Sequence, residues 1–275
     1  MMSNAEVSEK NAAYWDEMCG SHLAKTLGIT DSKPESLRRF DDWYFDYYPY
    51  LADHIRFDSL DGKHVLEVGL GYGSVSQRIA EAGARYQGLD IAAGPVALVN
   101  TRLAQRELPG RANQGSILAA PFPDEHFDQI VAIGCLHHTG DLVKSIGECH
   151  RLLKPGGSLV MMVYYAYSAR RYVQETSTTL RYLWRELLGY RGVVELTESR
   201  ARASYDANSE GNAAPHTDAI SGKSLMHLLR AFRSASYRLE NISQEPPFQR
   251  HTREQLLATK WPQRVGLDIY ATALK

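Results

Sequence analysis

Cysteine is scarce in this chain. Its three cysteines, Cys19, Cys135 and Cys149, are too few for a disulfide framework and agree with a reducing compartment. The formal net charge is -1, so no excess of either sign favours nucleic acid as a partner. The first residues lack the apolar core of a signal sequence, and no apolar run is long enough to cross a membrane. These absences predict a cytoplasmic protein that binds neither nucleic acid nor a membrane.

The residues that are present favour an α/β fold. The 275 residues are 44% hydrophobic, which is enough for one large domain with an insertion. Short apolar runs alternate with helical patterns after the turn signal Asp61-Gly62. This alternation predicts a Rossmann-like, doubly wound sheet that is mostly parallel and covered by helices on both faces. The expected strands are 64–69, 86–91, 111–116, 127–134 and 157–165, and the expected helices start near Gly73, Pro95 and Leu142.

Four segments are expected along the chain. Residues 1–60 form an N-terminal helical cap, with helices over 11–26 and from Pro34, and residues 61–165 form the cofactor-binding core. Residues 166–220 are too long for a tight connection and predict a lid of helix and loop. Residues 221–275 begin with a helix capped by Ser221 and end in a hairpin of strands 237–245 and 267–274. This hairpin would complete a seven-stranded sheet whose last strand is antiparallel.

The most informative feature is a glycine turn that follows the first strand. Gly69, Gly71 and Gly73 come directly after an apolar run, and the next strand ends in Asp90. Glycine lets backbone N–H groups reach a ligand that a β-carbon would hold away. A strand, a glycine turn, a helix and a second strand that ends in a carboxylate are typical of a nucleoside-binding half-site.

Two further motifs make the pattern more specific. The run 121–128 (PFPDEHFD) leads into the fourth strand, and the run 151–157 (RLLKPGG) leads into the fifth. Together with 65–73, 88–90, 115–117 and 135–138, these motifs strongly resemble the class I S-adenosylmethionine-dependent methyltransferases. The resemblance covers about residues 60–165 and is greatest to the small-molecule branch that includes ubiquinone and menaquinone biosynthesis enzymes. It implies S-adenosylmethionine as the cofactor and S-adenosylhomocysteine as the product.

The resemblance also implies a role for individual residues. Glu67 and the three glycines would surround the methionine part of the cofactor, and Asp90 would accept hydrogen bonds from both ribose hydroxyls. Ser116 and Ile117 resemble the pair that reads the adenine edge, although these enzymes usually carry an acidic residue at the position of Ser116. The remaining expected cofactor contacts are Tyr14, Ile91, Ile133 and Gly134.

Histidines are the candidates for proton transfer. His137 lies where the resembled enzymes often carry histidine, and His216 lies beside a proline in the expected lid. Either residue would serve a hydroxyl acceptor as a general base, or would be structural. His138 is expected to cap the loop before the helix that starts near Leu142. The spacing of the cysteines and histidines is not that of a structural zinc site, so no metal is expected.

The acceptor is left open by the sequence. A small molecule or a short peptide-like acceptor, methylated on oxygen, nitrogen or a carboxylate, agrees with the resemblance. The seven arginines of residues 166–204 would suit an anionic acceptor, but a solvated helix face explains them more simply. The aromatic cluster 43–48 is expected to be mainly core, while Tyr14 and Trp15 would close over the sulfonium or also belong to the core.

Two other functions remain as alternatives. A nicotinamide-dependent oxidoreductase shares the fold, but Ser74 replaces the third glycine of its fingerprint and no Tyr-x-x-x-Lys pair is present. A non-catalytic module that only binds the cofactor is the second alternative. The oligomeric state cannot be read from the sequence.

Overall fold

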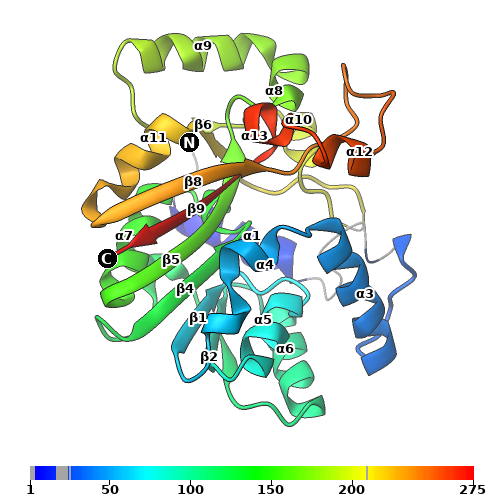
Figure 1. The fold of residues 1–275 in the computed structure, drawn as a ribbon, viewed down its shortest axis with the longest axis vertical. Coiled ribbons are helices and arrows are strands. Elements are labelled where there is room, and N and C mark those ends of the chain that lie inside the picture. Colours follow the sequence, from blue (N-terminus) through cyan, green and yellow to red (C-terminus); the bar gives the residue numbers. More distant parts are fainter. Residues whose placement is uncertain (1–3, 17–23, 25, 209) are drawn as a thin grey trace.

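The core of the protein is one twisted, mostly parallel sheet, as predicted (Figure 1). The computed structural model describes residues 4–16, 24, 26–208 and 210–275. The sheet order is β3-β2-β1-β4-β5-β7-β6, with β9 paired to β5 and β8 paired to β9. The five core strands are mutually parallel: β1 (His64–Val68), β2 (Arg85–Asp90), β3 (Arg111–Gln114), β4 (Phe127–Ile133) and β5 (Leu153–Tyr165).

Period-two burial along these strands creates two apolar layers. In β1, Val65 packs in one core cluster, and Leu66 packs in the other. The first layer includes side chains of α4 (Leu51–Ile55), α5 (Ser74–Glu81) and α6 (Ala93–Gln105). The second includes side chains of α7 (Leu142–Leu152) and α11 (Gly222–Leu228). Because both faces of the sheet are covered, the strands read as nearly continuous apolar runs.

The 166–220 segment, which the sequence predicted as a lid, adds two strands to the sheet. It contains α8 (Ala169–Gln174), α9 (Thr176–Leu187), β6 (Val194–Glu195), α10 (Ser199–Ala203) and β7 (Asp218–Ile220). β7 pairs in parallel with the end of β5, and β6 pairs with β7. The prediction of seven strands was therefore too low, because strands of three and two residues leave no readable alternation in the sequence.

The C-terminal segment returns to the sheet through β8 (Ser234–Glu240) and β9 (Asp268–Leu274). Both pairings of β9 are antiparallel, and the side chain of Ser221 caps α11 as expected. The two strands are not a tight hairpin, however, because α12 (Arg253–Leu257) and α13 (Pro262–Val265) lie between them. Short 3-10 turns occur at Phe57–Ser59, Ile117–Ala119, Leu136–His138 and Leu229–Ala231.

Two N-terminal helices lie at the carboxyl end of the sheet. The first, α1 (Asn4–Trp15), begins earlier than predicted, and residues 17–23 and 25 of the predicted helix lie outside the described residues. The second, α3 (Pro34–Tyr47), is fixed to the core by a buried ion pair. Nη1 and Nη2 of Arg102, on α6, donate to the two carboxylate oxygens of Asp41 at 2.8 and 2.9 Å, and Ser74 donates to the same carboxylate.

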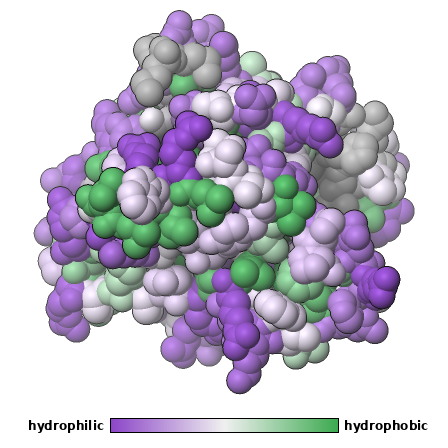
Figure 2. Space-filling model, turned by 90° about the horizontal axis from the view of Figure 1, so that it is seen from above, coloured by the Kyte–Doolittle hydropathy of each residue, from purple (hydrophilic) through white to green (hydrophobic). Residues whose placement is uncertain are grey.

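The outer end of the molecule exposes an apolar surface. Figure 2 looks onto this end and shows apolar side chains gathered among hydrophilic ones. On and just after α9, four large apolar residues are more than half exposed: Leu180, Trp184, Leu187 and Leu188. Within the described residues, no helix has both the length and the apolar character needed to cross a bilayer.

We predict that Asp41→Ala lowers the free energy of unfolding by about 3 kcal/mol, because it leaves the buried guanidinium of Arg102 without its counter-charge. Denaturant titration followed by circular dichroism measures this loss. Asp42→Ala is the matched control, since its side chain is exposed, and we expect it to change stability by less than about 0.5 kcal/mol. Equal effects of the two variants would show that the ion pair does not hold α3.

Candidate active site

The carboxylate of Asp90 organises the end of the first two strands. Its Oδ2 accepts from the backbone N–H of Leu70 at 2.7 Å, and its Oδ1 accepts from that of Ala92 at 2.9 Å. Each carboxylate oxygen can accept a further hydrogen bond, so Asp90 retains capacity for a ligand. Burial raises the pKa of Asp90, while the backbone N–H groups oppose this shift.

The glycine turn needs glycine for conformation and for space. Gly69 has φ +76°, and a β-carbon there would lie 2.4 Å from Cβ of Cys135. Gly73 has φ +77°, and a β-carbon there would lie 2.9 Å from side-chain atoms of Val99 and Arg102. The turn therefore exposes main chain where a larger residue would strain or clash.

A second carboxylate, Glu67, is buried beside the turn. Its Oε2 accepts from the hydroxyls of Ser76 and Tyr86, at 2.5 and 2.8 Å. Burial raises the pKa of Glu67 to about 8, although these two hydrogen bonds act in the opposite direction. Glu67 is thus largely protonated at neutral pH, and a cation placed beside it would favour its ionised form.

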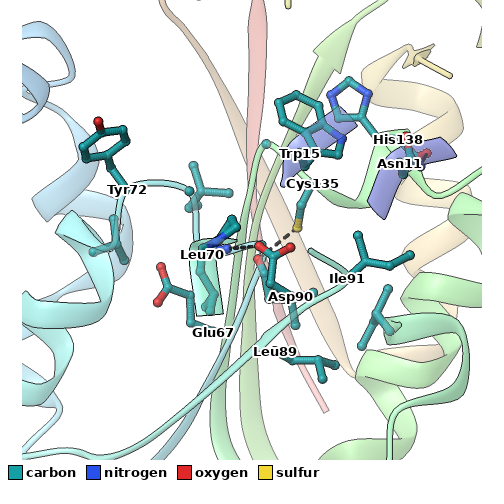
Figure 3. A pocket seen from close by; sticks show the side chains of 18 of the residues that line it. Asn11, Trp15, Glu67, Leu70, Tyr72, Leu89, Asp90, Ile91, Cys135 and His138 are labelled. Atoms are coloured by element: carbon teal, nitrogen blue, oxygen red, sulfur yellow. Dashed lines mark hydrogen bonds between the residues drawn. The ribbon is translucent and has the colours of Figure 1, made fainter. Parts of the chain in front are cut away.

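These groups border a cavity of about 330 Å³, within the range of small-ligand sites. The cavity lies where the sheet order reverses between β1 and β4, the usual ligand position in doubly wound folds. Figure 3 shows Glu67 and Asp90 on one side, with Asn11, Trp15 and His138 across from them. Nine of the predicted contacts line the cavity: Glu67, Gly69, Gly71, Asp90, Ile91, Ser116, Ile117, Ile133 and Gly134.

Four of the predicted site residues are not part of the described lining: Tyr14, Gly73, His137 and His216. Gly73 lies behind the turn as the N-cap of α5. The hydroxyl of Tyr14 donates to the backbone carbonyls of Asp206 and Asn212, in the insertion. Its neighbour Trp15 lines the cavity instead, because a helix turns successive side chains about 100° apart.

Neither histidine that the sequence suggested as a base faces the cavity. His137 is fully buried, and burial, with His138 and His216 nearby, keeps its pKa well below the usual range. Burial also acts to lower the pKa of His216, but Asp218 at 3.2 Å and Glu195 at 3.6 Å outweigh it and raise the pKa. His216 is thus stabilised as a cation by carboxylates on β6 and β7.

Of the described histidines, His138 lines the cavity. It was expected to cap the loop before α7 through a backbone bond, but its ring bonds the backbone of the insertion instead, and Asp141 caps α7. Nδ1 of His138 lies 2.7 Å from the carbonyl oxygen of His216. A carbonyl oxygen can only accept a hydrogen bond, so this Nδ1 carries a proton. In the neutral ring the lone pair is therefore on Nε2, which lies 3.4 Å from Oδ2 of Asp206.

The N-terminal helices supply an aromatic wall, of which the sequence suggested Trp15. Side chains from both helices line the cavity. They are Ser8, Asn11 and Trp15 on α1, and Phe40, Trp43, Tyr44 and Tyr48 on and beside α3. The cluster 43–48 is therefore partly pocket wall rather than mainly core. The amide of Asn11 donates to the backbone carbonyl of His138 at 2.6 Å and fixes α1 over the site. The aromatic density of 40–48 is the sequence signal that could have identified this wall.

We predict that Asp90→Ala weakens binding of S-adenosylhomocysteine by roughly 1–3 kcal/mol, because ribose hydroxyls would lose their acceptor. Isothermal titration calorimetry measures the change. Asp124→Ala is a suitable control, since that carboxylate is exposed and outside the cavity lining. Unchanged affinity in Asp90→Ala would place the ribose elsewhere.

We also predict that this affinity rises with pH between about 6 and 8. The cofactor's ammonium group would pair with ionised Glu67, whose pKa is about 8 in the free protein. Binding then lowers that pKa and releases a proton, so binding tightens as the proton concentration falls. Glu67→Gln should bind with little pH dependence over this range. The same pH profile in both proteins would show that Glu67 does not cause the pH dependence of the affinity.

Comparison with known proteins identifies the domain that contains these residues. Residues 66–161 match the family described as "Methyltransferase domain". The ubiquinone biosynthesis O-methyltransferase of Pseudomonas aeruginosa (strain UCBPP-PA14) is 35% identical over 105 residues, which are 37% of this chain and 44% of that protein. The demethylmenaquinone methyltransferase of Tropheryma whipplei (strain Twist) is 33% identical over 101 residues, 36% of this chain and 41% of its own. The match thus spans less than half of each relative.

Solved structures extend the likeness of fold to most of the chain. A SAM-dependent methyltransferase from Methanosarcina mazei has a TM-score of 0.54 at 19% identity, covering 80% of this chain and 96% of its own. The [4+2]-cyclase SpnF has a TM-score of 0.55 at 17% identity, and the alignment covers 96% of this chain and 94% of the cyclase. At these identities the likeness concerns the fold alone. Residues 66–161 therefore form a methyltransferase domain, and S-adenosylmethionine is the cofactor that this domain and fold imply.

Proposed function

We propose that this protein transfers the methyl group of S-adenosylmethionine to a hydroxyl of a small aromatic acceptor. The observation that carries the proposal is the cavity itself, which joins the Asp90 and glycine-turn half-site to an aromatic wall. When bound, the cofactor supplies an electrophilic methyl group on a sulfonium. Asp90, Glu67 and the main chain of the turn would hold it, and their free acceptor capacity fits a ligand with hydroxyl and ammonium donors.

The aromatic wall supports a planar, apolar acceptor. Ring faces are offered by Trp15, Trp43, Tyr44 and Tyr48. None of the arginines of residues 166–204 is among the described lining. This placement gives no reason to choose an anionic acceptor. Both relatives are named for quinone chemistry, and a ring of that class would suit the wall.

His138 is our candidate for the group that accepts the hydroxyl's proton. Nδ1 is committed to the carbonyl of His216, which leaves the lone pair on Nε2. Nε2 is buried beside the carboxylate of Asp206, at 3.4 Å, so an acceptor hydroxyl would have to displace this contact to reach it. An oxygen acceptor is favoured over a neutral amine because an amine needs no such group. The same likeness to methyltransferases disfavours the nicotinamide alternative.

We predict that the protein, incubated with methyl-labelled S-adenosylmethionine and the small-molecule fraction of a cell extract, labels a ring-bearing hydroxyl compound. Mass spectrometry identifies the product. His138→Gln should lower the rate by roughly a hundredfold while binding S-adenosylhomocysteine within a few-fold of wild type. Tyr172→Phe, an exposed change outside the described lining, is the control.

Two outcomes would contradict parts of this proposal. Cofactor binding without label in any small molecule would favour a non-catalytic module. A labelled product with an unchanged rate in His138→Gln would remove His138 as the proton acceptor, and a labelled nitrogen would replace the hydroxyl by an amine.

A further inference from the structure

Helix α9 packs with its polar side toward the interior of the protein. The buried residues of this helix are Thr179, Tyr182 and Glu186, all of them polar. The outward residues include Leu180, Trp184 and Leu187, followed by Leu188, which are 51%, 64%, 68% and 72% exposed. A surface helix of a globular protein normally shows the reverse arrangement. We call these four apolar residues the outer face of α9.

Specific hydrogen bonds hold the helix in this orientation. The carboxylate of Glu186 accepts from Tyr167, Ser221 and Ser224. The hydroxyl of Tyr182 donates to the carbonyl of Gly192 at 2.7 Å. Rotating the outer face inward would break these bonds and leave buried polar groups unsatisfied, so the exposure of the apolar side is built into the fold.

Within residues 169–191, the exposed charges have one sign. Arg181 and Arg185 are exposed on α9, and neither forms an ion pair with a described residue. The two acidic residues of 169–191, Glu175 and Glu186, are not exposed. Apolar residues with tryptophan, bordered by arginine, are the composition of helices that lie in the interface of an anionic bilayer.

A second copy of this chain is a less suitable occupant. Four side chains, each half to three-quarters exposed, present on the order of 500 Å², below the ~800 Å² that each partner buries in a standard interface. A symmetric pair would also bring Arg181 and Arg185 of both copies together without exposed acids on α8 or α9 to neutralise them. A lipid surface instead supplies both the phosphate groups and the apolar layer.

The position of α9 allows contact with a flat surface. Figure 1 shows α9 lying across the outermost end of the molecule, beyond α8 and β6. We propose that the outer face of α9 is a docking surface for an anionic phospholipid membrane, with the leucines and Trp184 in the interface and Arg181 and Arg185 on the phosphates. The inference concerns peripheral binding and does not depend on the reaction at the cavity.

Co-sedimentation with vesicles tests the proposal. We expect the full chain to sediment with vesicles of phosphatidylcholine and phosphatidylglycerol, much less with phosphatidylcholine alone, and less at high salt. Leu187→Ser combined with Leu188→Ser should weaken the partition on the order of tenfold, since two apolar side chains leave the interface. Arg181→Gln combined with Arg185→Gln should weaken it and reduce its salt dependence.

Matched controls separate docking from general surface effects. Val143→Ser removes an apolar side chain that is 61% exposed on α7, and Arg38→Gln with Arg106→Gln removes two exposed cations elsewhere. These controls should bind vesicles as wild type does, and every variant should retain its affinity for S-adenosylhomocysteine. Failure to bind anionic vesicles, equal binding to neutral ones, or equal losses in the controls would overturn the proposal. So would a dimer in analytical ultracentrifugation that the two leucine substitutions abolish.

Discussion

The buried carboxylate of Asp90 joins the parts of the site that would otherwise be separate. It ends β2, yet its two oxygens accept hydrogen bonds from the glycine turn after β1 and from the start of the loop before α6. The position of the turn relative to the sheet depends on these bonds. A carboxylate can accept several hydrogen bonds at once, so the group that fixes the turn also has capacity for a ligand.

The rest of the cavity depends on segments that are far apart in the sequence. Asn11 fixes α1 to the loop after β4, and Tyr14 fixes the same helix to the insertion. The backbone carbonyl of His216, in the insertion, accepts a hydrogen bond from Nδ1 of His138 and so fixes the tautomer of that ring. The ends of the core strands therefore provide the half-site of the cofactor, while α1 and α3 line the space beside it and the insertion holds α1 in place.

The balance between burial and charge gives each ionisable group of the site a different state. Burial, with His138 and His216 nearby, keeps the pKa of His137 well below its usual range, whereas two carboxylates overcome burial and raise the pKa of His216. Burial raises the pKa of Glu67 to about 8, although two hydrogen bonds and the charge of Arg102 oppose this shift. Neighbouring histidines thus differ in chemistry because their surroundings differ, which residue type alone does not reveal.

The sequence by itself determined the five parallel core strands, the glycine turn, Asp90 and the cap at Ser221, because these depend on period-two burial and on short-range backbone geometry. It also identified nine of the residues that line the cavity, since motifs at strand ends meet at one edge of a parallel sheet. Only the tertiary structure decided that Trp15 rather than Tyr14, and His138 rather than His137 or His216, lines the cavity. Adjacent residues have similar local signals, and which of them is turned inward depends on packing against segments that are distant in the sequence. The same holds for α9, whose apolar side faces outward because Ser221, Ser224 and Tyr167 donate to Glu186 on its polar side.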